Sequence, residues 1–426
     1  MKKRVLIISY YWPPAGGPGV QRWLKFVKYL PEFNVEPILF IPENANYPMH
    51  DNSLSSEVNK DLKVIRYPIF EFSSFFRKNK KLNSIRSGNV AKSNQQSTLQ
   101  KLLFFIRGNL FIPDMKIFWK SKSVNFLQNY LSNNKIDVVI TTGPPHSLHL
   151  IGFELKRRLG IKWISDFRDP WVNLNYLNRF HLLPFVKNYH KRLRDLVIKN
   201  SDAVIVTSKR LKDLFSEINS NVCQITNGYD FVIPDVKLDT KFSISHIGSL
   251  YPERNPKVLW DVLDELSRNI EGFNKNLKIN LIGNVSEKIK NNLNKRIFNE
   301  CIVYHDYLSY REALKFMCSS QVLMMIEVDD DYSSYVIPGK LFDYLNSNRP
   351  IISIGPEKWE VKDILSNTSS GISFNYRDYD SLNRHLKKMY KDYLTNLNKS
   401  KRNNNIEVYH RKNLTSKLAE LINKIS

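Results

Sequence analysis

The stretch from Gln321 to Gly355 constrains the fold more than any other part of the sequence. It opens with an apolar run, Val322 to Ile326, that is typical of a buried strand. An acidic loop, Glu327 to Tyr335, separates this run from an expected helix that has Pro338 in its first turn. The residues from Ile351 to Gly355 predict the next parallel strand. The pattern therefore indicates a strand, a loop, a helix and a second strand.

The loop and the helix start of this unit have the composition of an anion site. A loop that leaves a parallel strand leads to a helix N-terminus, where free N–H groups favour an anion. Gly339 lets a ligand approach the backbone, Lys340 adds a positive charge, and Asp343 can accept hydrogen bonds from sugar hydroxyls. We expect a nucleotide diphosphate pocket at the start of a helix beginning near Ile337. The alternative is a helix start capped by the protein itself, with Lys340 and Asp343 solvated.

The length and composition of the chain favour a two-domain globular protein. It has 426 residues, of which 42% are hydrophobic and 25% charged. The three cysteines, Cys223, Cys301 and Cys318, show no paired spacing, so we expect neither a disulfide framework nor a zinc site. No apolar stretch is long enough to cross a bilayer. We expect a cytoplasmic protein without a bound metal or cofactor.

The chain is strongly basic. It contains 64 Lys and Arg residues against 41 Asp and Glu residues, which gives a net charge of +23. This excess suits a polyanionic partner, and nucleic acid, an anionic membrane surface and phosphorylated substrates all fit it. A general bias of the sequence towards Lys and Asn is the alternative explanation.

The first predicted strand, Val5 to Ile8, leads into a loop rich in glycine and proline. Tyr10 to Gly19 contains three glycines and three prolines, which fix a rigid turn. Gly16 and Gly17 lie in its centre, where the backbone can approach a ligand. The loop lacks the spacing of a dinucleotide-binding or P-loop motif, so its position behind the first strand is its main functional signal.

Two further strands lead into loops with ionisable side chains. Val138 to Thr142 precedes a loop that contains His146, and Trp163 to Asp166 precedes a loop that contains Asp169. Open α/β sheets bind ligands at the carboxyl ends of their strands. Both loops are therefore candidate ligand contacts.

Residues 71–123 interrupt the alternation of strands and helices, and we interpret them as a basic insertion. Within it, Leu99 to Arg107 places many apolar residues beside cations, and Phe180 to Arg194 repeats this composition later in the chain. Each segment could lie in a membrane interface or form a core helix beneath a loop.

A second alternation of strands and helices begins at Phe242. The strand Ser243 to Ile247 leads into a loop that contains Gly248 and Arg254, and a helix follows. We therefore predict an α/β protein of two doubly wound domains. The expected boundaries are 1–236 for the N-terminal domain, 237–395 for the C-terminal domain, and 396–426 for a tail ending in a helix.

Five segments in this order resemble the family-four retaining glycosyltransferases of the GT-B fold. They are Pro13 to Gly19, Ser165 to Trp171, Thr226 to Asp230, His246 to Leu250, and Pro338 to Pro350. The resemblance covers nearly the whole chain except the insertion. It implies two Rossmann-like domains facing a cleft, the second holding a nucleotide-sugar and the first an acceptor. The last helix would pack back on the N-terminal domain.

The resemblance also implies roles for residues of the second domain. Gly248 and Arg254 would contact the donor, Arg254 standing where the family has a Lys on the diphosphate. Asp343 stands at the second glutamate of a paired motif that holds the ribose. The first glutamate would fall at Tyr335, and Ser249 replaces a common Arg. Lys340 could restore that missing charge.

In the first domain the resemblance implies a catalytic region. His146 matches a cleft histidine near the donor sugar, and a helix-start histidine bonded to backbone is the alternative. Asp169 could orient an acceptor hydroxyl, whereas a salt bridge with Arg168 or a capping role is the alternative. Gly16 and Gly17 would approach the donor phosphates or the acceptor, unless they serve the turn alone.

Three functional hypotheses follow. The first is a hexosyltransferase that extends a lipid-linked or cell-surface glycan at the inner face of a bacterial membrane, as part of polysaccharide biosynthesis. The second is a nucleotide-sugar epimerase of the same fold. The third is a basic nucleic-acid-binding protein, although the sequence contains no recognisable reader motif, so we expect no nucleic-acid partner.

Overall fold

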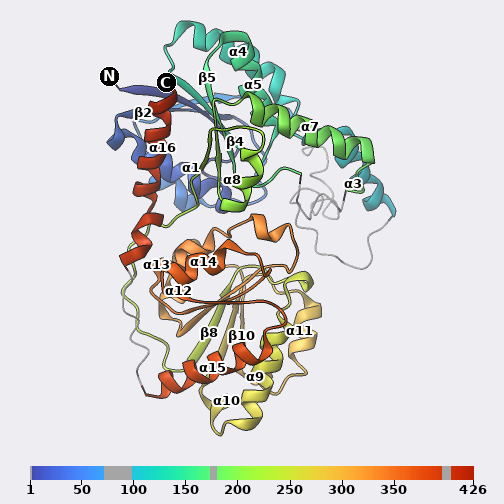
Figure 1. Ribbon diagram of the computed structural model, residues 1–426, viewed down its shortest axis with the longest axis vertical. Coiled ribbons are helices and arrows are strands. Elements are labelled where there is room, and N and C mark those ends of the chain that lie inside the picture. The colour runs from blue at the N-terminus through green and yellow to red at the C-terminus, as the bar shows by residue number, and fades with distance from the viewer. Residues whose placement is uncertain (1, 72–97, 173–179, 396–403) are drawn as a thin grey trace. The chain divides into compact units, whose positions relative to one another are not determined.

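A computed structural model describes residues 2–71, 98–172, 180–395 and 404–426 (Figure 1). The chain divides into two compact units. The first comprises Met1–Asn227 together with Arg411–Ser426, and the second comprises Gly228–His410. The division thus falls after Asn227, ahead of the boundary at 236 that the sequence suggested.

The first unit is built on a parallel sheet of seven strands. The strand order is β3-β2-β1-β4-β5-β6-β7, so the chain runs outward from β1 and then returns to its other side. Val5, Leu6, Ile7 and Ile8 are fully buried, as expected for a central strand covered on both faces. The strands are β1 Lys3–Ile8, β2 Val35–Pro42, β3 Lys63–Tyr67, β4 Val138–Gly143, β5 Lys162–Phe167, β6 Ala203–Val206 and β7 Val222–Gln224.

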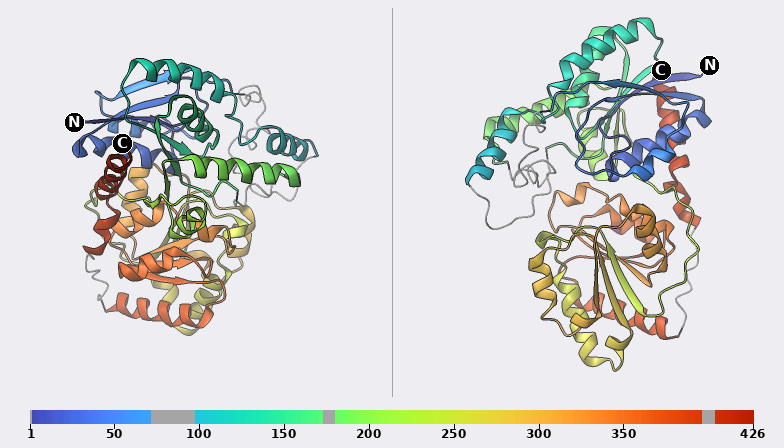
Figure 2. Two further views of the ribbon diagram at one scale, coloured as in Figure 1. Left: turned by 45° about the horizontal axis from the view of Figure 1, so that its top comes forward. Right: turned by 180° about the vertical axis from the view of Figure 1, so that it is seen from behind.

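Helices cover both faces of this sheet (Figures 1 and 2). The C-terminal helix α16 packs beside α1, and Lys412 Nζ lies 2.6 Å from Glu32 Oε2. The helices are α1 Pro18–Tyr29, α3 Thr98–Leu110, α4 Trp119–Asn133, α5 Ser147–Leu159, α7 Pro184–Asn200, α8 Lys209–Ser216 and α16 Arg411–Ile425, with short 3-10 turns at η1 Leu30–Phe33 and η2 Asn52–Glu57.

The second unit contains a parallel sheet of six strands in the order β10-β9-β8-β11-β12-β13. Strand β11 shows how the sheet is buried. Val322, Met324 and Ile326 face a core that includes α9 and α15, whereas Leu323 and Met325 face a second core with α12, α13 and α14. The strands are β8 Phe242–Ile247, β9 Leu277–Ile282, β10 Ile302–His305, β11 Val322–Ile326, β12 Ile351–Ile354 and β13 Gly371–Phe374.

Figure 1 shows the two helical layers of this unit on opposite sides of its sheet. The helices are α9 Lys257–Asn269, α10 Phe273–Asn276, α11 Glu287–Leu293, α12 Tyr310–Ser319, α13 Lys340–Asn346, α14 Glu360–Asn367 and α15 Tyr379–Leu394, with 3-10 turns at η5 Pro252–Arg254, η6 Asn299–Cys301, η7 Ser333–Tyr335 and η8 Asn404–Tyr409.

These two doubly wound parallel sheets confirm the predicted fold class. Of the predicted insertion, residues 72–97 lie outside the described residues, as do residues 396–403 of the tail. The end of the predicted insertion already belongs to α4, whose Trp119 and Ser123 are buried. Among the described residues, no helix is both long enough and apolar enough to cross a membrane.

A buried ion pair ties together three elements of the first unit. Arg22 on α1 donates from Nη2 to Asp166 Oδ1 on β5 at 2.9 Å, and both side chains are fully buried. Arg22 also donates to the carbonyls of Ile225 and Thr226, which follow β7. Burial alone would raise the pKa of Asp166, but Arg22 and the hydrogen bond from Trp23 hold that pKa below its ordinary value.

We predict that Arg22→Ala destabilises the first unit by about 3–5 kcal/mol, because it leaves the Asp166 carboxylate buried without its counter-charge. Five of the seven tryptophans lie in this unit, so their fluorescence in a urea titration reports its unfolding. Arg157→Ala is the control, since it removes an exposed pair with Glu154 and should cost less than about 1 kcal/mol. Equal losses for the two variants would contradict the prediction.

Candidate functional site

The candidate site of the second unit lies where β8 and β11 end. These strands are adjacent and parallel, so the loops behind Ile247 and Ile326 leave the same edge of the sheet. Lys340, the first residue of α13, donates from Nζ to the carbonyl of Ile247 at 3.3 Å. Gly248 adopts a φ of +133°, a backbone conformation that favours glycine. A Cβ atom on Gly248 would lie 3.5 Å from Lys340 Nζ.

Lys340 carries its charge at an electrostatic cost. Burial and, to a lesser extent, the nearby Arg254 guanidinium lower the pKa of Lys340 to about 7, and the Glu327 carboxylate opposes both effects. A second negative charge beside Lys340 would therefore restore its protonated form. The site favours an anion because the nearby Glu327 carboxylate does not fully compensate the charge of Lys340.

Arg254 is held in place by Glu327, the first residue after β11. Its Nε and Nη2 atoms lie 2.9 and 2.8 Å from Glu327 Oε1, which also accepts the N–H of Val328 at 3.0 Å. Glu327 is only 7% exposed, whereas the Arg254 side chain is 37% exposed. The guanidinium is thus oriented by a buried carboxylate and remains accessible to a ligand.

Sequence reasoning missed Glu327 as a functional residue and treated it as the start of an acidic loop. The signal that could have found it is its position directly behind one central strand, opposite a cation in the loop behind the neighbouring strand. His246 was also missed. It is buried on β8, its Nδ1 lies 3.1 Å from the Met324 carbonyl, and its Nε2 has no hydrogen-bond partner among the described residues.

The helix behind this loop differs from its prediction. Helix α13 begins at Lys340, with Gly339 as its N-cap, so Pro338 precedes the helix instead of occupying its first turn. The amides of Leu341 and Phe342 bond to the carbonyls of Pro338 and Gly339, which closes a tight turn at this end. Because α13 has only seven residues, its dipole adds little, and the side-chain cations carry the positive potential.

Asp343 and Tyr344 are both engaged within the second unit. Asp343 Oδ1 accepts a hydrogen bond from the Tyr310 hydroxyl at 3.0 Å, and the Tyr344 hydroxyl accepts the N–H of Ile247 at 3.0 Å. Asp343 is therefore not simply solvated, as one alternative held. The structure gathers Gly248, Arg254, Gly339 and Lys340 at one sheet edge, with Asp343 one turn further along α13.

In the first unit, Gly16 and Gly17 lie between β1 and α1. The N–H of Gly16 donates to the Met49 carbonyl at 2.9 Å, which fastens the loop to the chain that follows β2. Gly17 is the N-cap of α1 with a φ of +95°, and a Cβ atom there would meet no heavy atom within 4 Å. Gly16 thus has a structural contact, whereas Gly17 borders open space.

His146 precedes α5 and is buried in an aromatic stack. Its ring lies 4.6 Å from that of Trp171 at an interplanar angle of 10°. Burial lowers the pKa of His146 well below its ordinary value, and the neighbouring His149 adds to this effect, so the ring is neutral. Neither ring nitrogen has a hydrogen-bond partner among the described residues, so the expected alternative of a backbone-bonded histidine is not seen.

Asp169 lies in the loop behind β5. The alternative of a salt bridge with Arg168 is not seen, because Arg168 donates instead to the carbonyls of Gly143 and Pro144 at 3.2 and 2.6 Å. Burial raises the pKa of Asp169, and Arg168 counteracts part of that rise. The Asp169 carboxylate makes no hydrogen bond or ion pair with another described residue, so it is available to a substrate.

Sequence reasoning also missed a buried carboxylate of the first unit. Glu71, behind β3, accepts a hydrogen bond from the Tyr10 hydroxyl at 2.5 Å and lies 2.8 Å from Lys116 Nζ. In the sequence, Glu71 marks only the start of the predicted insertion, because nothing in the local pattern links it to Tyr10 or Lys116. Within the described residues, no group of three or more His, Cys, Asp or Glu side chains could hold a metal ion.

The sequence matches no protein-family model, and no curated protein matches it. Its fold, however, matches solved structures along nearly the entire chain. A glycosyltransferase from Rickettsia africae ESF-5 has a TM-score of 0.61 at 12% identity, covering 100% of this chain and 98% of that one. Anabaena Alr3699/HepE in complex with UDP-glucose has a TM-score of 0.61 at 10% identity, covering 99% of each chain.

The lipopolysaccharide outer core galactosyltransferase WaaB has a TM-score of 0.59 at 13% identity, covering 99% of each chain. A putative UDP-N-acetylglucosamine 2-epimerase from Listeria monocytogenes has a TM-score of 0.56 at 10% identity, covering 100% of this chain and 96% of that one. At such low identity these matches show a shared fold alone. The chain has the GT-B fold of these glycosyltransferases.

Proposed function

We propose that this protein is a retaining glycosyltransferase that resembles family four and moves a hexosyl group from a nucleotide-sugar to a glycan or lipid-linked acceptor. The observation that carries the proposal is the group formed by Lys340, Arg254 and Gly248 at the carboxyl edge of β8 and β11. Two cations beside the partly exposed backbone at Gly248 are suited to a diphosphate.

The donor chemistry follows from this arrangement. Negative charge accumulates on the diphosphate as the glycosidic bond breaks, and fixed cations stabilise that charge where it develops. Lys340 and Arg254 perform this role, while Glu327 keeps Arg254 oriented. Asp343, steadied by Tyr310, accepts hydrogen bonds from the ribose. HepE was solved with UDP-glucose, which supports a nucleotide-sugar donor.

The acceptor chemistry belongs to the first unit. In a retaining reaction of this kind the acceptor hydroxyl attacks on the face from which the diphosphate departs, so no protein nucleophile is required. Asp169, whose carboxylate makes no hydrogen bond or ion pair with another described residue, orients that hydroxyl. The family resemblance assigns the neutral ring of His146 to the donor sugar and the backbone at Gly16 and Gly17 to the substrate. Gly17, which has a φ of +95° and borders open space, is the better suited of the two glycines.

We further propose that the acceptor is a lipid-linked or cell-surface glycan and that the protein works in the cytoplasm at the inner face of the membrane. The fold shared with a lipopolysaccharide galactosyltransferase supports this substrate class. A nucleotide-sugar epimerase is the second candidate, because one structure with this fold is described as such an enzyme. Product analysis separates the two, since an epimerase converts the donor without any acceptor.

We predict that a nucleotide-sugar raises the melting temperature of the protein, because a ligand that binds only the native state stabilises it. Arg254→Ala and Lys340→Met should each abolish the shift by removing a charge from the diphosphate. The control is Lys362→Met, which removes an exposed cation of α14 and should leave the shift intact. A thermal-shift screen over nucleotide-sugars measures all four proteins.

The same screen can reject the donor proposal. No shift with any nucleotide-sugar, or equal shifts in the wild type and the Arg254 and Lys340 variants, would remove the basis for the assigned site. Steep salt-dependent binding of oligonucleotides in place of nucleotide-sugars would favour the nucleic-acid hypothesis instead.

A second prediction concerns pH. The free protein has a Lys340 pKa of about 7, below the ordinary 10.5, so Lys340 loses its proton as pH rises above 7. The diphosphate binds the protonated form, and affinity should therefore fall with rising pH, approaching about tenfold per unit. Lys340→Arg keeps its charge and should bind with little pH dependence. Calorimetry of both proteins between pH 7 and about 9 measures this, and identical profiles would contradict it.

A third prediction is that turnover does not depend on a metal ion, because Lys340 and Arg254 neutralise the leaving diphosphate. Adding a chelator such as EDTA to an assay of sugar transfer should leave the rate unchanged. Loss of activity that magnesium restores would show instead that a divalent cation completes the neutralisation.

A further inference from the structure

Helices α3 and α7 of the first unit meet at one end of α7, as all views in Figures 1 and 2 show. The contact region between them, called the joint below, is tightly packed. Phe104, Phe180, Leu182 and Val186 form a separate buried cluster. Asn109 fixes it, because its Oδ1 accepts the N–H of Leu183 at 2.9 Å and its Nδ2 donates to the His181 carbonyl. The two helices therefore present their outer sides as a rigid surface.

The outer side of α3 is apolar although nothing described covers it. Phe104 and Gly108 face the joint, and the opposite side carries Leu102 and Leu110, which are 53% and 73% exposed. Phe105 lies on the flank of α3 next to Phe104 and is 36% exposed. A helix of a globular protein normally turns polar residues to solvent, so an apolar outer stripe indicates a partner surface.

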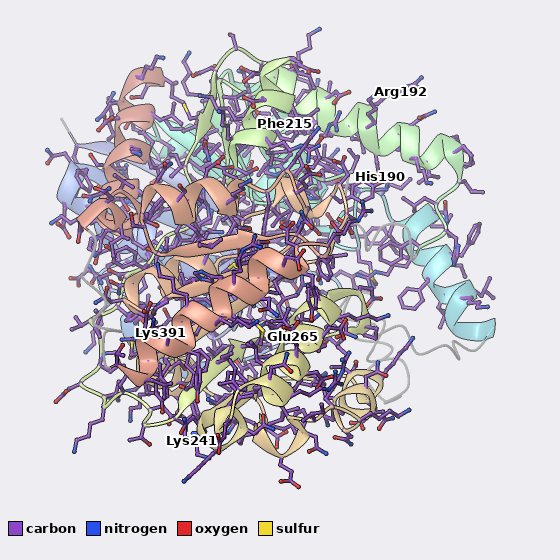
Figure 3. The ribbon with its side chains drawn as sticks, turned by 60° about the horizontal axis from the view of Figure 1, so that its bottom comes forward. His190, Arg192, Phe215, Lys241, Glu265 and Lys391 are labelled. Carbon is purple, nitrogen blue, oxygen red and sulfur yellow. The ribbon has the colours of Figure 1, made fainter. Side chains whose placement is uncertain are left out.

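Helix α7 shows the same feature with a regular spacing. Phe185, Tyr189, Arg192 and Leu196 follow each other at intervals of four, three and four residues, which places them on one side of the helix. Phe185 is 68% exposed, and Tyr189 and Leu196 are also exposed. In Figure 3, Arg192 and the buried His190 lie on opposite sides of α7.

The charges of this surface have one sign. Lys191, Arg192 and Lys199 on α7 are exposed on or beside the side that carries Phe185, Tyr189 and Leu196, and none forms an ion pair with another described residue. Helix α3 contains no acidic residue, and the one acidic residue of α7, Asp195, is bound by its neighbour Arg194. The surface thus combines aromatic and aliphatic side chains with uncompensated cations.

We infer that this outer surface of α3 and α7 docks on an anionic lipid bilayer. Leu102, Leu110, Phe185 and Tyr189 enter the interfacial region, and Lys191, Arg192 and Lys199 contact lipid phosphates. A nucleic acid would satisfy the cations but would leave the aliphatic residues Leu102 and Leu110 in water. The inference deepens the proposed function, because a lipid-linked acceptor would reach the first unit from that bilayer, but its test requires no catalysis.

The test is co-flotation of the full-length protein with phosphatidylcholine vesicles prepared with and without phosphatidylglycerol. We expect binding to the anionic vesicles and its loss on adding salt. A charge variant, Lys191→Gln with Arg192→Gln and Lys199→Gln, should lower partitioning at least about tenfold. An apolar variant, Leu110→Ser with Phe185→Ser and Tyr189→Ser, should lower it by a similar factor even at low salt.

Two control variants remove equivalent groups elsewhere. Lys241→Gln with Lys391→Gln removes exposed cations of the second unit, both labelled in Figure 3, and Leu394→Ser with Val408→Ser removes exposed apolar residues. Both should float like the wild type. Control and surface variants that bind equally, or a wild type that ignores anionic lipid, would overturn the inference. Oligonucleotide binding that only the charge variant loses, without vesicle binding, would assign the surface to nucleic acid and also overturn it.

A local readout removes any doubt about folding. Brominated lipid in anionic vesicles should quench the tryptophan fluorescence of Phe185→Trp more than that of the wild type. It should not quench the added fluorescence of Leu394→Trp, and quenching of both or neither would contradict the inference. Each variant is also tested for the thermal shift with nucleotide-sugar. Vesicle binding lost with the shift retained separates a failure of this surface from a failure of the donor site.

Discussion

Parallel pairing is the constraint on which the sites of both units depend. Every strand of a parallel sheet ends at the same edge, so residues far apart in the sequence meet there without any long-range signal in the chain. In the second unit this brings Gly248, behind β8, next to Lys340, although 92 positions separate them (340 − 248 = 92). In the first unit it places His146, behind β4, against Trp171, behind β5. The chemistry of each site is therefore a consequence of strand order.

Electrostatics decide how the donor site can act. Arg254 forms an ion pair with Glu327 that holds it in place, whereas Lys340 has a backbone carbonyl as its hydrogen-bond partner among the described residues and a pKa of about 7. A dianionic ligand thus meets one oriented cation and one that becomes fully charged when the ligand arrives. The diphosphate stabilises the two cations when it binds, because burial makes the charge of Lys340 unfavourable in the free protein.

The sequence was sufficient for the fold class and for the position of the candidate donor loop between β11 and α13, since both are local patterns. The apolar run from Val322 to Ile326 and the Gly and Lys at 339 and 340 each predict their own surroundings. It was insufficient for partners, because Glu327 and Tyr310 bind Arg254 and Asp343 across separate strands and helices. The helix also begins at Lys340 instead of near Ile337, since tight i to i+3 bonds at residues 338–342 precede the regular helix. The sequence left two interpretations for α3 and α7, a membrane interface or a core helix, because periodicity alone does not tell which side of a helix the core covers.

The loop behind β5 provides the strongest physical argument that Asp169 acts on a substrate. Trp171 has a φ of +65°, a left-handed conformation that costs a bulky residue roughly 1–3 kcal/mol. The strain is maintained by the stack on His146 and by the hydrogen bond from Trp171 Nε1 to His190 Nδ1 at 3.3 Å. On the other side, Arg168 is fixed by the carbonyls of Gly143 and Pro144. Asp169 is thus positioned by both flanks while its own carboxylate makes no hydrogen bond or ion pair within the described chain. A strained loop that orients an unpaired carboxylate of raised pKa is costly for folding, so a role in binding is the simplest account of why the chain keeps it.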